Sequence, residues 1–219
     1  MLERARAFGV VFGGPLVLDV AATAAIAPTA KAACDHRRPS WPALAGVLAA
    51  GAYTTGVRHW MHHWGASSHE PPAHAIEIDA PPDEVWPWLA QIGQDRGGFY
   101  SYEWLENLAG CEMHNAAQIH PEWQHRDVGD DVRLHPAIGM PVSRFEPGRA
   151  IALEGWGSFE LEPLEGGRTR LVARCEPAHG AMRVFSALFV EIPHFIMERE
   201  MLLGIKRRAE AAWPPSRRN

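Results

Sequence analysis

The densest group of side chains that could perform chemistry lies between His114 and His125, where His120 and Glu122 also occur. Imidazole nitrogens and a carboxylate can bind Zn²⁺ or exchange protons as an acid–base pair. The spacing places no two of these residues on one face of a helix, and the segment is predicted to be a loop. We therefore expect no metal and no cofactor here. Two interpretations stay open, namely acid–base catalysis by His114, His120 and Glu122, and a hydrogen-bonded structural loop.

An aromatic cluster precedes this loop and contains Phe99, Tyr100, Tyr102 and Trp104. Tyrosine and tryptophan combine an apolar body with a polar tip, which suits the mouth of a ligand pocket. The alternative is that these side chains pack a short helix onto a sheet. Arg133 follows on a predicted strand, where its guanidinium could bind a ligand carboxylate or carbonyl oxygen. A surface ion pair is the alternative for Arg133.

The elements that must position these residues begin at a short strand predicted over His74–Asp79, where apolar residues alternate with polar ones. Two prolines and Asp83 then start a helix, because proline fits the first helical turn and a carboxylate complements the helix N-terminus. A second short helix is predicted over Tyr102–Leu108, with Ser101 as its cap.

Short alternating stretches separated by Gly and Pro turns follow, which indicates an antiparallel meander. A long helical pattern then runs from about residue 181 through Pro193 to the basic residues near 206–208. Its apolar side includes Phe195 and Met201, whereas Glu198, Arg199 and Glu200 are expected on its solvated face. The predicted strands cover residues 131–134, 142–146, 150–154, 158–164 and 169–174.

The first third of the chain differs in composition from the rest. Residues 1–69 carry six basic and three acidic side chains, whereas residues 70–219 carry 15 and 23. Trp41–Val57 is uncharged and close to the length that spans a bilayer, about 17–25 residues. Phe8–Ala30 is also apolar but contains Pro15 and Asp19, and a signal peptide is the alternative there. We expect a membrane-anchoring region over residues 1–65 and a ligand-binding domain over residues 66–219.

Composition excludes several other classes of protein. The net charge is −5, which argues against a nucleic-acid partner, since such proteins normally present a basic face. The three cysteines, Cys34, Cys111 and Cys175, form no CxxC pair, so neither a disulfide scaffold nor a cysteine zinc site is indicated. No GxGxxG, P-loop, HExxH or GxSxG motif occurs, which removes the main support for dinucleotide, triphosphate and common hydrolase chemistry.

Several segments resemble the SRPBCC superfamily, also called START-like or Bet v 1-like, in its polyketide cyclase/dehydrase-like bacterial branch. The stretch IEIDAPPDEVWPWLAQIGQ looks like the opening strand and helix of that superfamily. The later segments GGFYSYEWLENLAG, HNAAQIHPEWQ, VGDDVRL and PHFIMEREMLLGIKRRAE resemble the branch, so that the resemblance covers roughly residues 58–213. It implies an α+β helix-grip fold, in which a curved antiparallel sheet wraps around a long C-terminal helix, and a ligand cavity between them.

The resemblance does not fix a reaction, because one fold supports many functions. We expect a membrane-associated module, with its main domain cytoplasmic, that binds a hydrophobic small molecule such as a lipid or polyketide-like compound. Alternatives are a cyclase or dehydratase that uses His114, His120 and Glu122, and an interaction module with a filled core. Large apolar side chains at inward positions are expected to line the cavity with the aromatic cluster, namely Phe145, Trp156, Phe159, Phe195 and Met201.

Overall fold

The structure is a computed structural model that describes residues 40–52, 56–69, 71–176 and 190–213. The chain divides into two compact units. The first comprises the described parts of residues 1–62 and 178–196, and the second those of residues 63–177 and 197–219. The apolar stretch expected over Phe8–Ala30 lies outside the described residues.

An ion-pair cluster organises the first unit. The Arg58 guanidinium donates to both carboxylate oxygens of Glu191, at 2.8 and 2.5 Å, and His62 Nε2 lies 2.7 Å from Glu191 Oε1. Burial acts to raise the pKa of Glu191, but hydrogen bonds from His62 and Arg58 outweigh it and leave that pKa below its usual value. Trp60 packs edge-on against Phe195, with 5.6 Å between ring centroids. These contacts join α4 (Arg58–His62) to the start of α8 (Glu191–Ala212), and the first unit also contains α3 (Trp41–Ala52).

Helix α3 covers most of the stretch in which the sequence predicts a membrane span, and it exposes large apolar side chains. Trp41, Leu44 and Leu48 are all exposed, Trp41 to 76%. Among the described residues, no helix combines the length and the apolar character needed to cross a bilayer.

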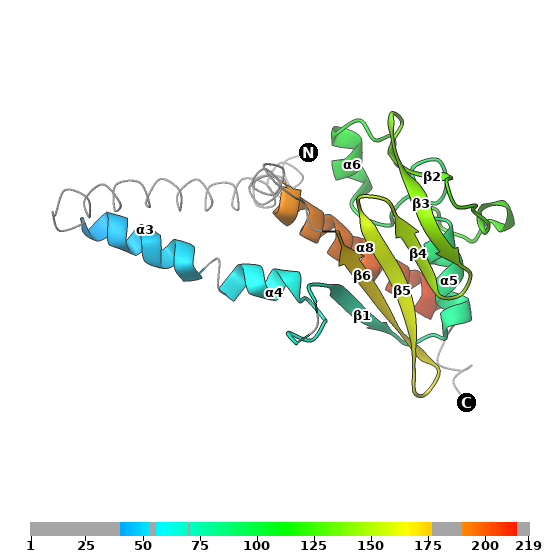
Figure 1. The fold of residues 1–219 in the computed structure, drawn as a ribbon. Coiled ribbons are helices and arrows are strands. Elements are labelled where there is room, and N and C mark those ends of the chain that lie inside the picture. The colour runs from blue at the N-terminus through cyan, green and yellow to red at the C-terminus, as the bar shows by residue number, and fades with distance from the viewer. Residues whose placement is uncertain (1–39, 53–55, 70, 177–189, 214–219) are drawn as a thin grey trace. The chain divides into compact units, whose positions relative to one another are not determined.

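The second unit contains a six-stranded antiparallel sheet in the order β1-β6-β5-β4-β3-β2, and the predicted meander is confirmed. Figure 1 shows the strands curling from β1 towards β2. Together with the C-terminal helix this is an α+β fold, as the sequence predicts. The strands are β1 (His74–Ile78), β2 (Asp131–His135), β3 (Ile138–Glu146), β4 (Ala150–Leu153), β5 (Gly157–Leu164) and β6 (Arg168–Cys175).

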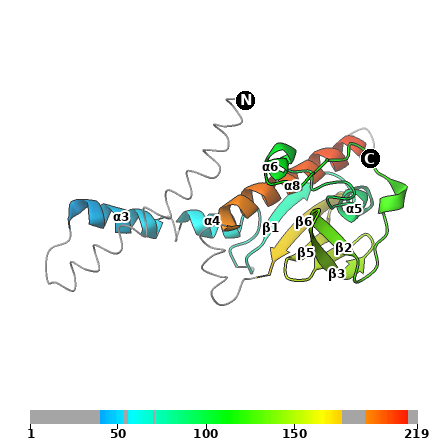
Figure 2. The same cartoon turned by 90° about the horizontal axis from the view of Figure 1, so that it is seen from above.

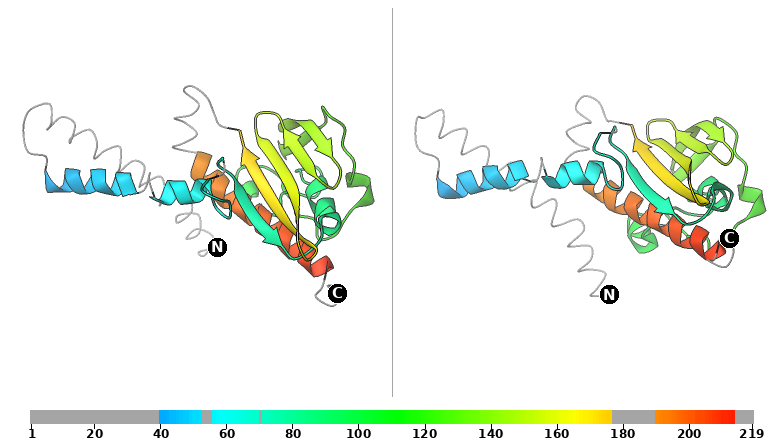
Figure 3. Two further views of the ribbon diagram at one scale, coloured as in Figure 1. Left: turned by 60° about the horizontal axis from the view of Figure 1, so that its bottom comes forward. Right: turned by 90° about the horizontal axis from the view of Figure 1, so that it is seen from below.

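One face of the sheet, called the inner face below, carries the core of this unit. Helix α5 (Pro82–Ala90) packs against β5 and β6, and α8 from Met197 onward lies across the same face (Figures 2 and 3). Met201 and Ile205 of α8 belong to one buried cluster with Phe159 and Leu171 of the sheet. Removing such side chains from water is the main stabilising contribution to a fold of this kind.

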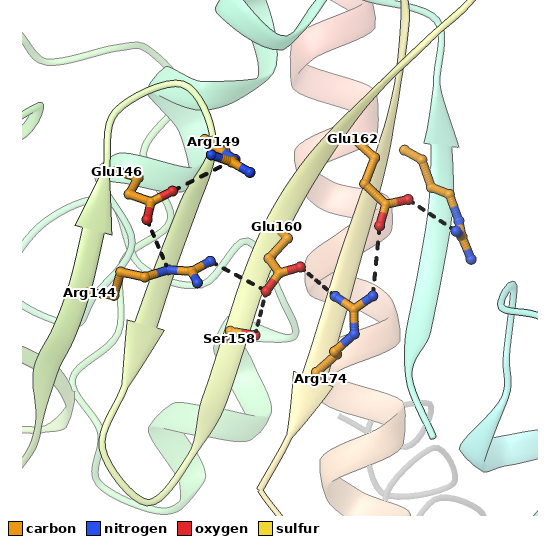
Figure 4. Close-up of polar contacts among 8 residues, drawn as sticks. Arg144, Glu146, Arg149, Ser158, Glu160, Glu162 and Arg174 are labelled. Carbon is orange, nitrogen blue, oxygen red and sulfur yellow. Dashed lines mark hydrogen bonds and ion pairs between the residues drawn. The ribbon is translucent and has the colours of Figure 1, made fainter. Parts of the chain in front are cut away.

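The opposite, outer face carries a row of charged side chains. The row alternates in sign across the strands, so that each carboxylate lies between two guanidinium groups (Figure 4). Its closest contact joins Arg174 Nη1 to Glu160 Oε2 at 2.6 Å, and Arg144 lies 3.4 Å from the same carboxylate. The outer row, as we call it, comprises Arg149, Glu146, Arg144, Glu160, Arg174, Glu162 and Arg170.

A glycine in α8 allows a close backbone approach to the aromatic cluster. A Cβ atom on Gly204 would lie 2.2 Å from the carbonyl oxygen of Tyr100, so only glycine fits there. Tyr100 itself adopts a positive φ of 58°, which is unfavourable for a residue with a bulky side chain. The position of Tyr100 is therefore set by its packing and hydrogen bonds rather than by backbone preference.

Candidate functional site

The three histidines of the loop each contact a different carboxylate. His114 Nδ1 lies 3.3 Å from Glu103 Oε1 and is 84% exposed. His120 Nδ1 lies 3.3 Å from Glu122 Oε1, and its ring stacks on Trp123 with centroids 4.0 Å apart. The predicted loop is confirmed, apart from one short 3-10 turn over Pro121–Trp123.

The exposure of these groups does not favour the acid–base interpretation. The Glu122 side chain is 63% exposed, and a backbone hydrogen bond and His120 hold its pKa below the usual range. A carboxyl group with a lowered pKa is ionised at neutral pH and cannot serve there as a general acid. Catalysis by His114, His120 and Glu122 stays a prediction.

A buried hydrogen-bond network beneath the loop supports the structural interpretation. Gln91 Nε2 donates to Tyr100 Oη at 2.9 Å and to the Gln118 carbonyl at 3.1 Å. Its Oε1 accepts from the backbone N–H of His120 at 3.0 Å. The buried Arg126 guanidinium donates to the carbonyls of Ala90, Ile92 and Asp131. Both side chains satisfy backbone groups that would otherwise be buried without partners.

The aromatic cluster is more deeply placed than a pocket mouth requires. Phe99 and Tyr100 are buried, whereas Tyr102 and Trp104 are partly buried. The Arg208 guanidinium lies 4.6 Å above the Tyr100 ring, within the range of a cation–π interaction. Burial raises the pKa of Tyr100 far above its usual value, although Gln91 and Arg208 act in the opposite direction. Tyr100 is thus a neutral anchoring residue at physiological pH.

The other predicted ligand residues fall into three environments. Phe159 and Met201 are buried in the inner-face core, and Phe145 and Trp156 pack against that core while partly exposed. Arg133 lies at the surface, with Nε 3.9 Å from an Asp95 oxygen, so the structure favours its surface ion-pair interpretation. Phe195 belongs to the first unit, where it is buried against Trp60.

The prediction that Glu198 lies on the solvated face of α8 is wrong. Its side chain is 4% exposed and contacts Nδ1 of His74, which is itself 11% exposed. Cys175 Sγ lies 3.7 and 4.0 Å from the two carboxylate oxygens of Glu198. The three residues come from the start of β1, the end of β6 and α8, and all belong to the second unit. We call them the His74–Cys175–Glu198 cluster.

Sheet register explains why His74 and Cys175 meet. His74 is paired with Ala173 across β1 and β6, and Cys175 lies two residues further along β6. Alternate residues of a strand point to the same face, so both side chains point to the inner face as diagonal neighbours. Burial of the thiol, together with the Glu198 carboxylate, raises the pKa of Cys175 far above its usual value. A thiol in this state is not an activated nucleophile.

A second carboxyl group with unusual properties lies on α6 (Glu103–Leu108). Burial, with a smaller contribution from the charge of Glu103, raises the pKa of Glu106 to about 7. Within the described residues, Glu106 Oε2 is buried and has no hydrogen-bond partner. Burial and the Glu106 charge also raise the pKa of Cys111. A carboxyl group that titrates near neutrality can act as a general acid or base.

Comparisons with known proteins supply no relative. No family model, no curated protein and no solved structure matches the chain.

Proposed function

We propose that residues 66–219 form a helix-grip domain that binds a hydrophobic small molecule, of lipid or polyketide-like character, between the sheet and α8. We further propose that the N-terminal hydrophobic region associates with a membrane. The two proposals belong together, because a ligand of this kind partitions into bilayers and a carrier or sensor of it gains from being near one.

The observation that carries the ligand proposal is the difference between the faces of the sheet. The inner face of β4, β5 and β6 is lined by aliphatic and aromatic side chains, including Ile151, Phe159, Leu161 and Leu171. The few polar groups on this side lie near strand ends, where His74 contacts Glu198 of α8 and Thr169 Oγ1 donates to the Ala80 carbonyl. An apolar surface with a few polar groups is typical of sites for amphipathic small molecules.

Native mass spectrometry of the full chain, purified in mild detergent, tests this proposal. The native mass is compared with the denatured mass, and any bound compound is extracted into organic solvent. A discrete extra mass that extracts into the solvent supports the proposal. A bare protein mass, also after incubation with a total lipid extract, contradicts it and favours the interaction module with a filled core.

Two alanines on opposite faces of the sheet provide matched variants. Ala173 of β6 faces inward beside Phe159, and Ala152 of β4 faces outward beside Arg144. Ala173→Leu should reduce the bound mass, because its added carbons occupy inner space, whereas Ala152→Leu should leave it unchanged. Circular dichroism confirms that both variants are folded. An equal reduction in both variants would place the ligand elsewhere.

The exposed apolar surface of α3 supports the membrane proposal. Trp41 and Leu48 are among the most exposed large apolar residues of the described chain, and tryptophan favours the bilayer interface. The Trp41→Glu/Leu48→Glu double variant should float less efficiently with liposomes than the unchanged full chain. Val128→Glu is the control, since Val128 is 68% exposed but belongs to the second unit. Equal flotation of all three proteins would contradict the proposal.

A further inference from the structure

The segment of residues 102–114, which contains α6, is a loop whose two ends are fastened together. Asn115 Oδ1 accepts from the backbone N–H of Tyr100 at 2.6 Å, and Asn115 Nδ2 donates to the Ser101 carbonyl at 3.1 Å. Ser101 Oγ donates in turn to the Met197 carbonyl of α8 at 2.9 Å. A segment with its ends fixed in this way can open and close while the rest of the domain stays folded. We call residues 102–114 the α6 flap.

Two kinds of contact hold the α6 flap closed. Leu105 and Met113 are buried, and Met113 belongs to the core cluster of the inner face. The Asn107 side chain joins the end of α6 to the returning chain, because its Nδ2 donates to the Met113 carbonyl at 2.9 Å and its Oδ1 accepts from the Met113 N–H. The backbone N–H of Cys111 also donates to the Glu106 carbonyl at 3.1 Å. Unwinding of α6 would break these hydrogen bonds.

Other features of the α6 flap oppose its closure. Glu106 Oε2 is buried, and no described residue donates a hydrogen bond to it. An ionised carboxylate in such a position has lost its water without a compensating donor, whereas the protonated form has a much smaller desolvation cost. Glu112 adds backbone strain, since its φ of +49° lies in the left-handed region. The charge on Glu106 therefore decides how stable the closed flap is.

We propose that the α6 flap is a pH-dependent device, closed while Glu106 carries a proton and opened by unwinding of α6 when Glu106 releases that proton to solvent. Opening hydrates the Glu106 carboxylate and uncovers Leu105 and Met113. The inference does not depend on the proposed ligand-binding function, because no ligand takes part in the change or in its measurement.

In the part of the chain that the structure describes, no cation is paired with Glu106. Glu103, one turn earlier on α6, adds a negative charge that disfavours ionisation of Glu106. The titratable groups of the surrounding elements are neutral or contact other partners. They are His114, which contacts Glu103; Arg207 of α8, which contacts Glu200; His135 of β2, near Gly110, whose Nδ1 accepts from the Ala137 N–H; and the Cys111 thiol, whose pKa is raised by burial and by Glu106.

The direction of the pH dependence follows from the two states of Glu106. Burial raises its pKa to about 7 in the closed flap, whereas the usual value of 4.5 applies once the flap is open. Between these pH values the closed flap holds a proton that the open flap has lost, so opening becomes more favourable as pH rises through this window. Above the upper value both states are ionised and the dependence ends. Opening should therefore be at least about tenfold more favourable at pH 8 than at pH 5.

Amide hydrogen exchange of the full chain in mild detergent, followed by mass spectrometry at pH 5 and pH 8, tests the proposal. Observed rates are divided by the chemical rates of unprotected amides at each pH, which gives protection factors. The reporter amides are Gly110, Cys111 and Met113, whose N–H groups donate within the α6 flap. We expect their protection to fall at least about tenfold from pH 5 to pH 8, and to lie below that of β5 and β6 at both values. Flap protection that is independent of pH, or equal to that of the strands at both values, would overturn the inference.

Two glutamine variants assign the effect to one carboxyl group. Glu106→Gln cannot ionise, so its flap should show the same protection at pH 5 and pH 8. Glu112→Gln is the matched control, since Glu112 is an exposed carboxylate of the same flap, and it should keep the pH dependence of the unchanged chain. An undiminished fall in protection in Glu106→Gln, or loss of the fall in Glu112→Gln, would overturn the role of Glu106.

A third variant tests the opening without changing Glu106. Asn107→Ala removes both side-chain hydrogen bonds to Met113, so flap protection should fall about fivefold or more already at pH 5, where Glu106 is protonated. The same hydrogen-exchange measurement gives the result. Unchanged protection in Asn107→Ala at pH 5 would show that unwinding at this end of α6 does not open the flap, and would overturn the proposed motion.

Discussion

The inner and outer faces of the sheet both carry ionisable side chains, but in opposite environments. On the outer face, carboxylates and guanidinium groups alternate in a row, with Glu160 30% and Arg174 34% exposed (Figure 4). On the inner side the side chains of His74 and Glu198 contact each other and are only 11% and 4% exposed. The same types of contact therefore differ in how much water each charge has lost.

This difference determines what each region can do. Exposed ion pairs contribute about 0–1 kcal/mol each, because water screens the attraction and the side chains lose freedom. A buried pair has a large desolvation cost, and removal of one partner leaves a buried group uncompensated. Buried ionisable groups with specific partners are accordingly more often functional than exposed ones. The charges of the outer row therefore stay hydrated, whereas His74 and Glu198 have lost most of their contact with water.

Breaking the inner pair should have the largest effect on stability. Glu198→Leu leaves His74 buried beside an apolar side chain, and we expect the free energy of unfolding to fall by about 3–5 kcal/mol. Guanidinium chloride unfolding followed by circular dichroism measures the change. A loss below about 1 kcal/mol would mean that this pair is no more important to stability than an outer one.

A double variant distinguishes a broken pair from a poorly fitting leucine. The His74→Leu/Glu198→Leu variant removes both polar partners, so it should recover a large part of the stability lost in Glu198→Leu. If the double variant is as unstable as the sum of the two single variants, the two residues do not act as a pair.

The sequence predicts the sheet well, for a physical reason. Alternation of apolar and polar residues follows from the two faces of a strand, and Gly and Pro turns separate the strands. The predicted segments over 158–164 and 169–174 differ by one residue at their ends from β5 and β6. The same alternation predicts the outer row, because Glu160 and Glu162 alternate along β5 with residues that face inward.

The His74–Cys175–Glu198 cluster could not be predicted from such a pattern. The run Glu198-Arg199-Glu200 resembles a solvated helix face, and the partner of Glu198 is 124 residues away in sequence. One signal was present, since Glu198 lies three residues after Phe195 and three before Met201, within the buried stripe of α8. Gln91 gave no comparable signal, because its partners are groups brought together only by the folded loop.

Overpacking the inner side of the sheet should have the next largest effect on stability. Gly204→Ala places a Cβ atom 2.2 Å from the Tyr100 carbonyl oxygen, so α8 or the aromatic cluster must shift. We expect a loss of about 1–3 kcal/mol in the free energy of unfolding. Gly129→Ala is not a suitable comparison, since its φ of +97° adds strain of its own, whereas Gly51→Ala in α3 has open space around it. A loss in Gly204→Ala no larger than in Gly51→Ala would contradict the close approach.

Glu106 is a buried carboxyl group that can be compared with Glu198, which contacts His74. Burial raises the pKa of Glu106 in the folded state to about 7, above its usual value of 4.5, so between these pH values the folded state holds a proton that the unfolded state has lost. Stability should therefore fall as pH rises from about 4.5 to 7, by about 1–2 kcal/mol once partial exposure is allowed for. Glu106→Gln should remove this fall and be more stable than the unchanged chain at pH 8. A stability difference between the two proteins that does not change from pH 5 to pH 8 would show that Glu106 has an ordinary pKa.

Breaking the outer row should have the smallest effect on stability, and this effect should depend on the salt concentration. Glu160→Gln removes the charge that lies between Arg144 and Arg174, and we expect a loss of about 0.2–1 kcal/mol at low ionic strength. The Debye length falls from about 10 Å at 0.1 M salt to about 3 Å at 1 M, so the loss should largely disappear in 1 M NaCl. Glu198→Leu should keep most of its effect in the same salt, because water and ions do not reach the buried pair. Denaturant unfolding of both variants at the two salt concentrations makes the measurement. Equal salt sensitivity of the two variants would show that the inner pair is as hydrated as the outer row.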